Sequence, residues 1–369
     1  MTASGSAGAA PRRDVAYDDG AAAEPTGAQR HAGIDADAIA GWLAGRTDVT
    51  PPLRFARITG GLSNLTFHVW DARRRHWVLR RPPLHGVQQS AHDMAREHRI
   101  MAALAPSAVP VPAMIGLCED ETVTGAPFFV MDHVAGMVMR DPEEVARTDE
   151  AVRTHASSAL VDTLAALHAV DPDATGLGDL GRREQYCARQ LRRWHGQWEK
   201  VHTREVPEIT QVHARLVAAV PQQQGTAIVH GDYRLDNVIV DEHGDVAAVV
   251  DWELCTLGDP LADLGILWVY WKDPDDDVSP LPQTVTAQPG FLRKRDLVER
   301  YARGSARDLS DFDFYVALAY WRLAIILEGV YARFTSGAYG DTPEHVRRFE
   351  HTVPALARAA LDATARAGR

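Results

Sequence analysis

The sequence predicts an α+β protein with two lobes, a small N-terminal lobe built on an antiparallel β-sheet and a larger, mainly helical C-terminal lobe. Short apolar runs separated by turn residues fill the chain between about Leu53 and Met131, as in a sheet of short strands. Beyond them the chain is rich in alanine, and apolar residues recur at spacings of three and four. The 369 residues suffice for two lobes with separate cores. We expect the sheet lobe to cover residues 31–134 and the helical lobe residues 135–369.

The first two apolar runs, residues 53–58 and 65–70, flank a glycine-containing turn and predict a strand-turn-strand unit. Glycine allows the backbone to approach a phosphate group and to direct N–H groups toward it. A glycine hairpin is also common without any ligand, so this motif is weak on its own. The turn residues that we expect to contact a nucleotide are Gly60, Gly61, Ser63 and Asn64.

The next apolar run, residues 76–81, predicts a strand that ends before two prolines. Arg80 and Arg81 point to opposite faces of this strand, so only one can face the space between the lobes. Phosphoryl-transfer enzymes often use a lysine here, but the three lysines of this chain all lie in its second half. We therefore predict that Arg80 contacts the nucleotide phosphates with its forked guanidinium. The alternative is a solvated arginine on an edge strand.

The segment from Ser90 to Leu104 predicts a helix with a serine start, and its Glu97 could pair with Arg80. A further apolar run, residues 127–131, then predicts a strand that leads into a hinge between the lobes. Backbone groups there could bind adenine, so we expect nucleotide contacts at Met131 and His133.

The most informative segment is Val-His-Gly-Asp-Tyr-Arg-Leu-Asp-Asn, residues 229–237, which follows an apolar strand. Phosphoryl transfer uses an aspartate that accepts the proton of a hydroxyl group and, five residues later, an asparagine that binds Mg²⁺. We assign these roles to Asp232 and Asn237. Arg234 is expected beside the transferring phosphoryl group or its acceptor. An ordinary hairpin with turn residues is the alternative.

A second apolar strand, residues 246–250, delivers Asp251 after a turn at Gly244 and Asp245. Mg²⁺ usually takes one or two protein oxygens together with substrate phosphates, so Asn237 and Asp251 are the predicted metal ligands and Mg²⁺ and ATP the predicted cofactors. We expect the remaining polar residues around the loop to be structural: His168, His230, Asp236, Asp259 and Asp263.

Three segments together carry a family resemblance: His-Gly-Asp-Tyr-Arg-Leu-Asp-Asn (230–237), Val-Asp-Trp-Glu (250–253) and Gly-Asp-Pro-Leu-Ala-Asp-Leu-Gly (258–265). They resemble the aminoglycoside phosphotransferase and choline kinase superfamily, which has a protein-kinase-like fold. The likeness is closest to the branch with the kinase domains of acyl-CoA dehydrogenase family members 10 and 11, which shares the Val-Leu-Arg-Arg pattern. The resemblance implies an ATP-dependent kinase of a small molecule, and it favours a hydroxyacyl thioester or related hydroxy acid as acceptor.

Three alternatives stay open from the sequence. An aminoglycoside kinase would need an acidic acceptor site, which the net charge of −11 would suit. A nucleotide-binding pseudokinase would not need Asp232, Asn237 and Asp251 together. A metal-dependent hydrolase is the third alternative, with two aspartates and two histidines as metal ligands: His230, Asp232, His243 and Asp251.

Composition restricts the cellular setting and the partners. The net charge and a pI near 5.8 argue against nucleic-acid or anionic-membrane binding, which leaves a small hydroxylated molecule as the expected partner. Three scattered cysteines suggest reduced thiols in the cytoplasm. We see no uncharged apolar run of about 18 residues that would predict a spanning helix. Residues 1–30 are expected to be a disordered tail rather than an export signal.

Overall fold

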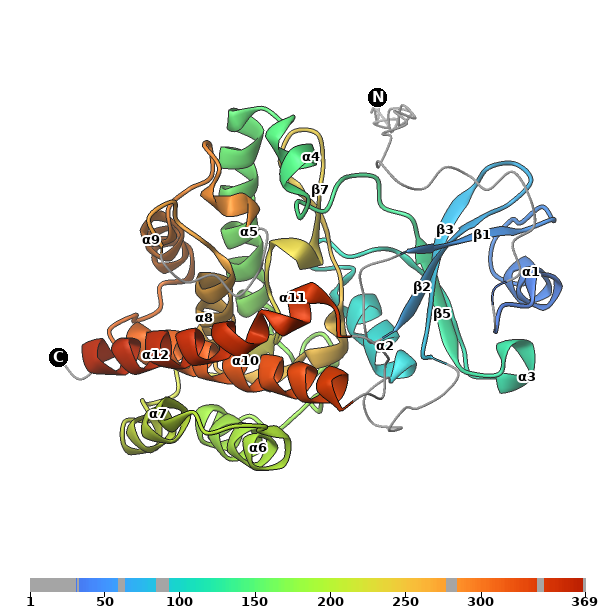
Figure 1. The fold of residues 1–369 in the computed structure, drawn as a ribbon. Helices are drawn as coiled ribbons and strands as arrows, with labels where there is room; N and C mark the ends of the chain where they lie inside the picture. Colours follow the sequence, from blue (N-terminus) through green and yellow to red (C-terminus); the bar gives the residue numbers. More distant parts are fainter. Residues whose placement is uncertain are drawn as a thin grey trace, which may run out of the picture.

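The computed structural model describes residues 31, 33–58, 64–83, 93–276, 284–336 and 342–367. A sheet lobe and a helical lobe lie side by side in this structure (Figure 1), which confirms the predicted α+β architecture. Several predictions fall outside the described residues: the tail, residues 1–30, the turn residues Gly60, Gly61 and Ser63, and the serine start at Ser90.

The sheet lobe contains a five-stranded sheet in the order β1-β2-β3-β5-β4, in which every pair is antiparallel. One face of this sheet is covered by apolar residues of α1, such as Ile39 and Leu43, which form a separate small core with Phe67 and Leu79. The elements of the lobe are α1 (Ala36–Ala44), β1 (Arg54–Ile58), β2 (Leu65–Trp70), β3 (His76–Arg81), α2 (Met94–Leu104), β4 (Met114–Cys118), α3 (Glu121–Thr124) and β5 (Phe128–Asp132).

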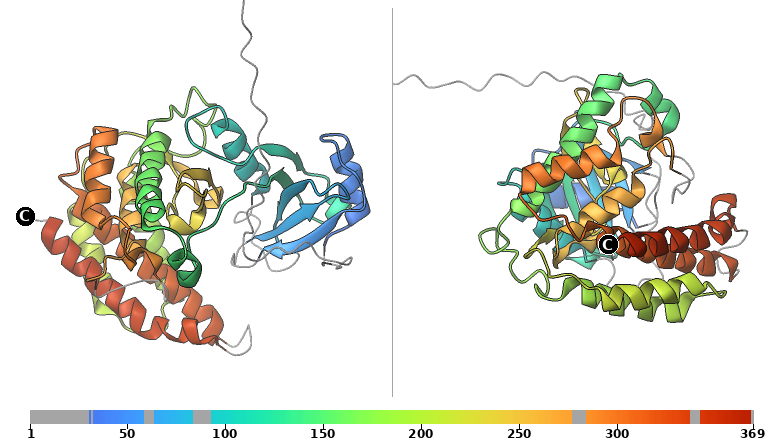
Figure 2. Two further views of the ribbon diagram at one scale, coloured as in Figure 1. Left: turned by 90° about the horizontal axis from the view of Figure 1, so that it is seen from above. Right: turned by 90° about the vertical axis from the view of Figure 1, so that its left-hand side faces the viewer.

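The opposite face of the sheet looks toward the helical lobe, and α2 lies between them (Figures 1 and 2). Val78 and Met131 on this face belong to the same core as the helices, because α2 packs on β4 and β5. The predicted helix is confirmed from Met94 onward, with Asp93 as its N-cap: the Asp93 carboxylate accepts a hydrogen bond from the Arg96 N–H at 2.9 Å.

The helical lobe is built around α10, which packs against α6, α7, α8 and α12. By length and composition α10 could cross a membrane, but 72% of its most apolar window is buried inside the fold. Its apolar composition is therefore explained by its central position. The helices of this lobe are α4 (Pro142–Ala146), α5 (Glu150–Ala169), α6 (Tyr186–Val201), α7 (Pro207–Ala218), α8 (Leu261–Tyr270), α9 (Lys294–Ser305), α10 (Phe312–Thr335), α11 (Glu344–Arg347) and α12 (Phe349–Ala367).

Two small antiparallel strand pairs lie in the helical lobe and carry the predicted site residues. β6 (Ala227–Val229) pairs with β9 (Thr256–Gly258), and β7 (Val238–Val240) pairs with β8 (Val246–Val249). The described residues of this lobe also form three short 3₁₀ helices: η1 (Leu235–Asn237), η2 (Trp252–Leu254) and η3 (Val285–Ala287).

A backbone bridge attaches the segment after β5 to the helical lobe. Met137 and Val240 exchange backbone hydrogen bonds of 2.8 and 2.9 Å, which join the predicted hinge to β7. Gly136 precedes this bridge with a φ of +147°, and a Cβ at this position would lie 2.6 Å from the carbonyl oxygen of Val240. The glycine is therefore required by a close backbone contact.

Candidate active site

The loop after β6 is held in shape by a buried carboxylate from α8. Asp263 accepts hydrogen bonds from the backbone N–H groups of His230 at 2.7 Å and Gly231 at 2.8 Å. Gly231 has a φ of +86°, and a Cβ there would lie 2.7 Å from the carbonyl oxygen of Leu254. Because a side chain does not fit, this position requires glycine.

Both nitrogens of His230 have partners inside the loop, as expected for a structural residue. Its Nδ1 accepts from the Asp232 N–H at 3.3 Å, so its Nε2 must carry the proton that is donated to the Val250 carbonyl at 3.0 Å. This pair of bonds connects the loop to the end of β8, next to Asp251.

His168 and Asp259 also have structural positions. His168 contacts the Tyr301 hydroxyl at 2.7 Å and Asp263 at 3.3 Å, and burial lowers its pKa. Asp259 accepts from the Tyr315 hydroxyl at 2.7 Å. Both contacts lie behind the loop, on the side of the core.

Asp232 and Asn237, five residues apart in sequence, are in direct contact. The Asn237 Nδ2 donates to the Asp232 carboxylate at 3.0 Å and to the Asp232 carbonyl at 2.8 Å. These two bonds use both amide hydrogens and define which end of the amide is the oxygen, so Oδ1 is the atom that Asn237 can offer a cation.

Arg234 connects the Asp232 carboxylate to the rest of the site. Its Nε lies 3.2 Å from Asp232 Oδ2, one of its terminal nitrogens donates to Asp236 at 2.7 Å, and its guanidinium lies 4.5 Å above the Tyr270 ring. Burial would lower the pKa of Arg234, but Asp232, Tyr270 and Asp236 outweigh burial and raise it. Arg234 is therefore a permanent cation next to Asp232.

Asp251 follows β8 in a left-handed backbone conformation, with a φ of +67°. This conformation is uncommon outside glycine and is tolerated best by Asp and Asn. It directs the carboxylate toward the sheet lobe, where the Arg80 guanidinium donates to Oδ1. Strained backbone of this kind is frequent at functional sites.

Arg80 lies among three carboxylates. Its Nε is 3.1 Å from Glu97 Oε2, and the guanidinium also contacts Asp251 and lies 3.7 Å from Glu253. The predicted Arg80–Glu97 pair is therefore present, and Arg81 points to the other face and donates to the Thr124 carbonyl. Burial raises the pKa of Glu97 to about 7, and the charges of Asp251 and Glu253 add to this effect although Arg80 opposes it.

Glu253 lies beside this group, and no role was predicted for it. Its carboxylate accepts from the Asn64 Nδ2 at 3.2 Å, across 189 residues of sequence, and this bond joins the turn before β2 to the segment after β8. The signal that could have found Glu253 is the second carboxylate of Asp-Trp-Glu, two residues after Asp251.

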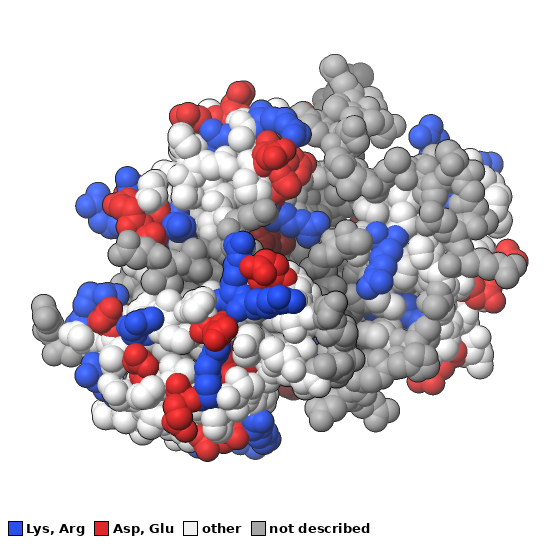
Figure 3. Space-filling model, in the orientation of Figure 1, with Lys and Arg blue, Asp and Glu red and all other residues white. Residues whose placement is uncertain are grey.

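Two open pockets adjoin the loop. One, of about 250 Å³, has Asp232 and Arg322 as its charged residues, and the rest of its lining is mainly apolar: Ile266, Val269, Tyr270, Ala319, Leu323 and Ile326. The other, of about 360 Å³, contains Arg140 and the Arg234–Asp236 pair. On the face shown in Figure 3, acidic and basic side chains are interspersed over the described surface of the helical lobe, so the net charge of −11 does not form one acidic patch there.

The metal-binding set of a hydrolase does not assemble around the loop. His243 lies in the exposed β7–β8 turn, where its backbone N–H donates to Asp241, and both nitrogens of His230 are engaged. Within the described part of the chain, the group of converging metal-type ligands is a different one: His68, His76 and His133.

Comparison with known proteins agrees with this geometry. The phosphotransferase enzyme family (APH) matches residues 54–324, which is more than half of the chain. The chain therefore belongs to this phosphotransferase family. The matched segment includes Arg80, Asp232, Asn237 and Asp251.

Two curated relatives show the extent of the likeness. Acyl-CoA dehydrogenase family member 10 of Mus musculus is 35% identical over 319 residues, which cover 82% of this chain and 29% of that protein. Acyl-CoA dehydrogenase family member 11 of Homo sapiens is 31% identical over 318 residues, which cover 85% of this chain and 40% of that protein. The chain thus spans less than half the length of these relatives.

Solved structures share the fold. A Ralstonia eutropha protein, provisionally described as an aminoglycoside phosphotransferase, has a TM-score of 0.76 and 30% identity, covering 90% of this chain and 98% of that one. A ternary complex of aminoglycoside phosphotransferase APH(4)-Ia with AMP-PNP and hygromycin B has a TM-score of 0.57 and 17% identity, covering 87% and 98% of the two chains. At this identity the second likeness concerns the fold alone.

Proposed function

We propose that this phosphotransferase moves the γ-phosphoryl group of MgATP to a hydroxyl group of a small metabolite with an apolar body, a hydroxyacyl thioester or a related hydroxy acid. The observation that carries this proposal is the position of Asp232. Its carboxylate lines a pocket whose walls are mainly apolar and whose other charged residue is Arg322. A substrate hydroxyl at Asp232 would therefore be attached to an apolar chain and lie close to a cation.

The transfer needs one proton acceptor and one fixed nucleophile. The oxygen of the acceptor hydroxyl forms a bond to the γ-phosphorus, and Asp232 takes the proton of that hydroxyl. At the same time, the bond between the γ-phosphorus and the leaving oxygen of ADP breaks. Asn237 and Arg234 hold the Asp232 carboxylate at 3.0 and 3.2 Å, so that its position is set before the acceptor binds. Arg234 also supplies positive charge beside the transferring group.

The nucleotide would lie against the face of the sheet that carries Arg80. We propose that Arg80 donates to phosphate oxygens while Glu97 keeps it oriented, as their ion pair suggests. The backbone of Met131 is already paired with β3 and β4, so its contribution to an adenine site would be its side chain. The remaining nucleotide contacts in this proposal come from the turn between β1 and β2 and from the hinge: Gly60, Gly61, Ser63, Asn64 and His133.

The residues present fit a magnesium ion at the end of β8. The donors are the Asn237 amide oxygen and the Asp251 carboxylate, and hard oxygen ligands in small number are what Mg²⁺ accepts. The Val250 N–H donates to the Asn237 carbonyl at 3.0 Å, which brings the two ligand residues to neighbouring strand ends. When bound, the ion would neutralise charge on the nucleotide phosphates. Arg80 uses Oδ1 of Asp251, so Oδ2 is the ligand atom in this proposal.

An aminoglycoside is a weaker candidate for the acceptor, because it is polycationic and needs several carboxylates. The pocket beside Asp232 contains no other carboxylate among the described residues, and it contains Arg322. The three cysteines are buried and unpaired, which supports a reducing compartment, and we propose the cytoplasm.

The test is a transfer assay with MgATP and a panel of hydroxyacyl-CoAs, free hydroxy acids, aminoglycosides and choline-like alcohols. The expected result is a product heavier by one phosphoryl group from a hydroxyacyl compound, absent with Asp232→Asn. Phosphorylation of an aminoglycoside alone would overturn the acceptor class. MgATP binding with no product across the panel would instead support a pseudokinase.

A further inference from the structure

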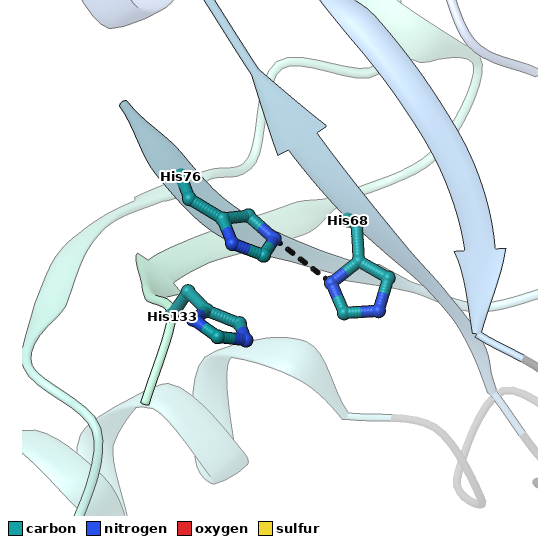
Figure 4. Close-up of side chains that lie close together, drawn as sticks. All are labelled: His68, His76 and His133. Atoms are coloured by element: carbon teal, nitrogen blue, oxygen red, sulfur yellow. Dashed lines mark hydrogen bonds between the residues drawn. The ribbon is translucent and has the colours of Figure 1, made fainter. Parts of the chain in front are cut away.

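Three histidines from separate elements gather on the face of the sheet that carries Val78 (Figure 4). His68 lies on β2, His76 begins β3, and His133 directly follows β5. The strand register explains the gathering. His68 pairs with Val78, two residues from His76 and on the same face, and the His133 N–H points to the His76 carbonyl at 3.4 Å.

The imidazole nitrogens of this histidine cluster converge. One nitrogen from each ring lies within 4.8 Å of the other two, and His68 Nδ1 is 2.9 Å from His76 Nε2. The His76 and His133 rings are stacked, with centroids 3.7 Å apart, and the Trp70 ring also stacks with His76, with centroids 4.6 Å apart. All three histidines are partly buried, so the cluster is sheltered from solvent but still reachable.

The contact between His68 and His76 requires a neutral imidazole. In the contact between His68 and His76 one nitrogen must donate and the other accept, so at least one of the two rings is neutral. Neutral imidazole is the form that binds metal ions, so this contact is compatible with a metal site.

We propose that His68, His76 and His133 bind one divalent transition-metal ion of the zinc type, with a water molecule or another ligand in the fourth position. Three imidazoles and an open fourth position are a common zinc ligand set, whereas Mg²⁺ prefers oxygen. Zinc–nitrogen bonds of about 2.0–2.1 Å place tetrahedral ligand atoms about 3.3 Å apart. The 2.9 Å between His68 Nδ1 and His76 Nε2 is close to this spacing. The His133 ring would have to rotate out of its stack on His76 to provide the third nitrogen.

This site is separate from the proposed magnesium site in both chemistry and position. It lies at the end of the sheet where β5 enters the hinge, and its ligands are nitrogens, whereas Asn237 and Asp251 offer oxygens from the helical lobe. Occupancy would fasten β2, β3 and the first hinge residue to one ion. The proposal does not depend on phosphoryl transfer, so either can fail alone.

The experiment uses the full chain after removal of any polyhistidine tag and of bound metal. Calorimetric titration with ZnCl₂ is made in excess Mg²⁺, which occupies oxygen sites. One equivalent of Zn²⁺ is expected to bind saturably, and Co²⁺ in its place should give the intense visible bands of a tetrahedral nitrogen site. His76→Ala should weaken Zn²⁺ binding at least tenfold, because loss of a residue that merely orients a zinc ligand already costs about 10- to 100-fold in affinity.

His195→Ala is the matched control, because His195 and His213 form a histidine pair with centroids 4.0 Å apart on the helical lobe. This variant should bind Zn²⁺ as the parent does. Zn²⁺ should also raise the Tm of the parent but not that of His133→Ala, which serves if His76→Ala folds poorly. Failure of Zn²⁺ to bind the parent, or equal binding by His76→Ala and the parent, would overturn the proposal.

Discussion

The Arg80 guanidinium is paired with Glu97 across the inner face of the sheet lobe, Nε to Oε2 at 3.1 Å, and the same group reaches Asp251 in the helical lobe. One cation thus joins β3, α2 and the segment after β8. Glu253, 3.7 Å away, adds a third carboxylate to this cation. Several consequences of this charge arrangement can be measured.

Removal of the Arg80 charge should be costly. Arg80→Met would leave mostly buried carboxylates without their cation, and loss of one partner of a buried ion pair costs about 3–5 kcal/mol of unfolding free energy. Urea denaturation measures the change, and the double variant Arg80→Met/Glu97→Gln should recover part of it. Arg300→Met is the control, because its exposed pair with Asp162 should be worth only about 0–1 kcal/mol. Equal losses in the two single variants would contradict the arrangement.

Stability should depend on pH through Glu97. Its pKa is raised from 4.5 to about 7, so between these values the folded protein holds a proton that the unfolded chain has lost. The free energy of unfolding should therefore fall as pH rises from about 4.5 to 7, by at most about 3 kcal/mol from this group. Denaturation curves at several pH values test this, and Glu97→Gln should show a flatter profile. An unchanged profile in that variant would assign the dependence to other groups.

Asp232→Asn should separate chemistry from binding. The amide keeps the shape of the side chain but cannot take a proton, and a general base contributes about 10²–10⁴ to the rate. We expect kcat to fall on this scale while the Kd for MgATP, measured by calorimetry, stays within a few-fold. Asp245→Asn, in the exposed β7–β8 turn, is the control. A variant as active as the parent would remove Asp232 from the role of base.

A pocket-filling change should affect only the acceptor. Ile326→Trp places a bulky ring in the apolar pocket beside Asp232. The KM for the acceptor should rise at least tenfold, because the ring occupies the space of the acceptor chain, and the Kd for MgATP should not change. Initial-rate kinetics with each substrate varied in turn make the distinction. An unaltered KM would show that the acceptor binds elsewhere.

The loop glycine should tolerate no side chain. Gly231→Ala combines a φ of +86° with a Cβ 2.7 Å from a backbone oxygen, and such strain costs about 1–3 kcal/mol. Gly196→Ala is the matched control: Gly196 lies on α6 with nothing within 4 Å of its Cβ position, and alanine there should stabilise the protein by about 0.5–1 kcal/mol. Thermal unfolding compares the two, and equal Tm values would contradict the predicted difference.

Much of this structure could be predicted from short patterns. Strands β2 and β3 follow from apolar runs bounded by a glycine-containing turn and by two prolines, because those signals are local. The Asp232–Asn237 contact also follows from spacing within one loop. The Arg80–Glu97 pair was expected once the strand and helix were placed, since each presents one charged residue to the same space.

The sequence was less informative where the cause is three-dimensional. The role of Glu253 depends on Asn64, which is 189 residues away, and no periodicity reports such a contact. The histidine cluster likewise depends on strand register, because His68, His76 and His133 are unremarkable individually. The cap of α2 was also not predicted: Asp93 takes this position, and the predicted serine start lies outside the described residues.

The bridge between Met137 and Val240 determines which parts of the chain can pivot. Val240 ends β7, and its partner β8 leads directly to Asp251. We therefore expect residues from Met137 onward to move together with the helical lobe. Residues 133–136 lie between β5 and this bridge, so they are the part of this connection that can change conformation if the lobes close on a nucleotide. Structures of different states should therefore superpose from residue 137 onward, and the rotation of the sheet lobe should show as backbone torsion changes within those four residues.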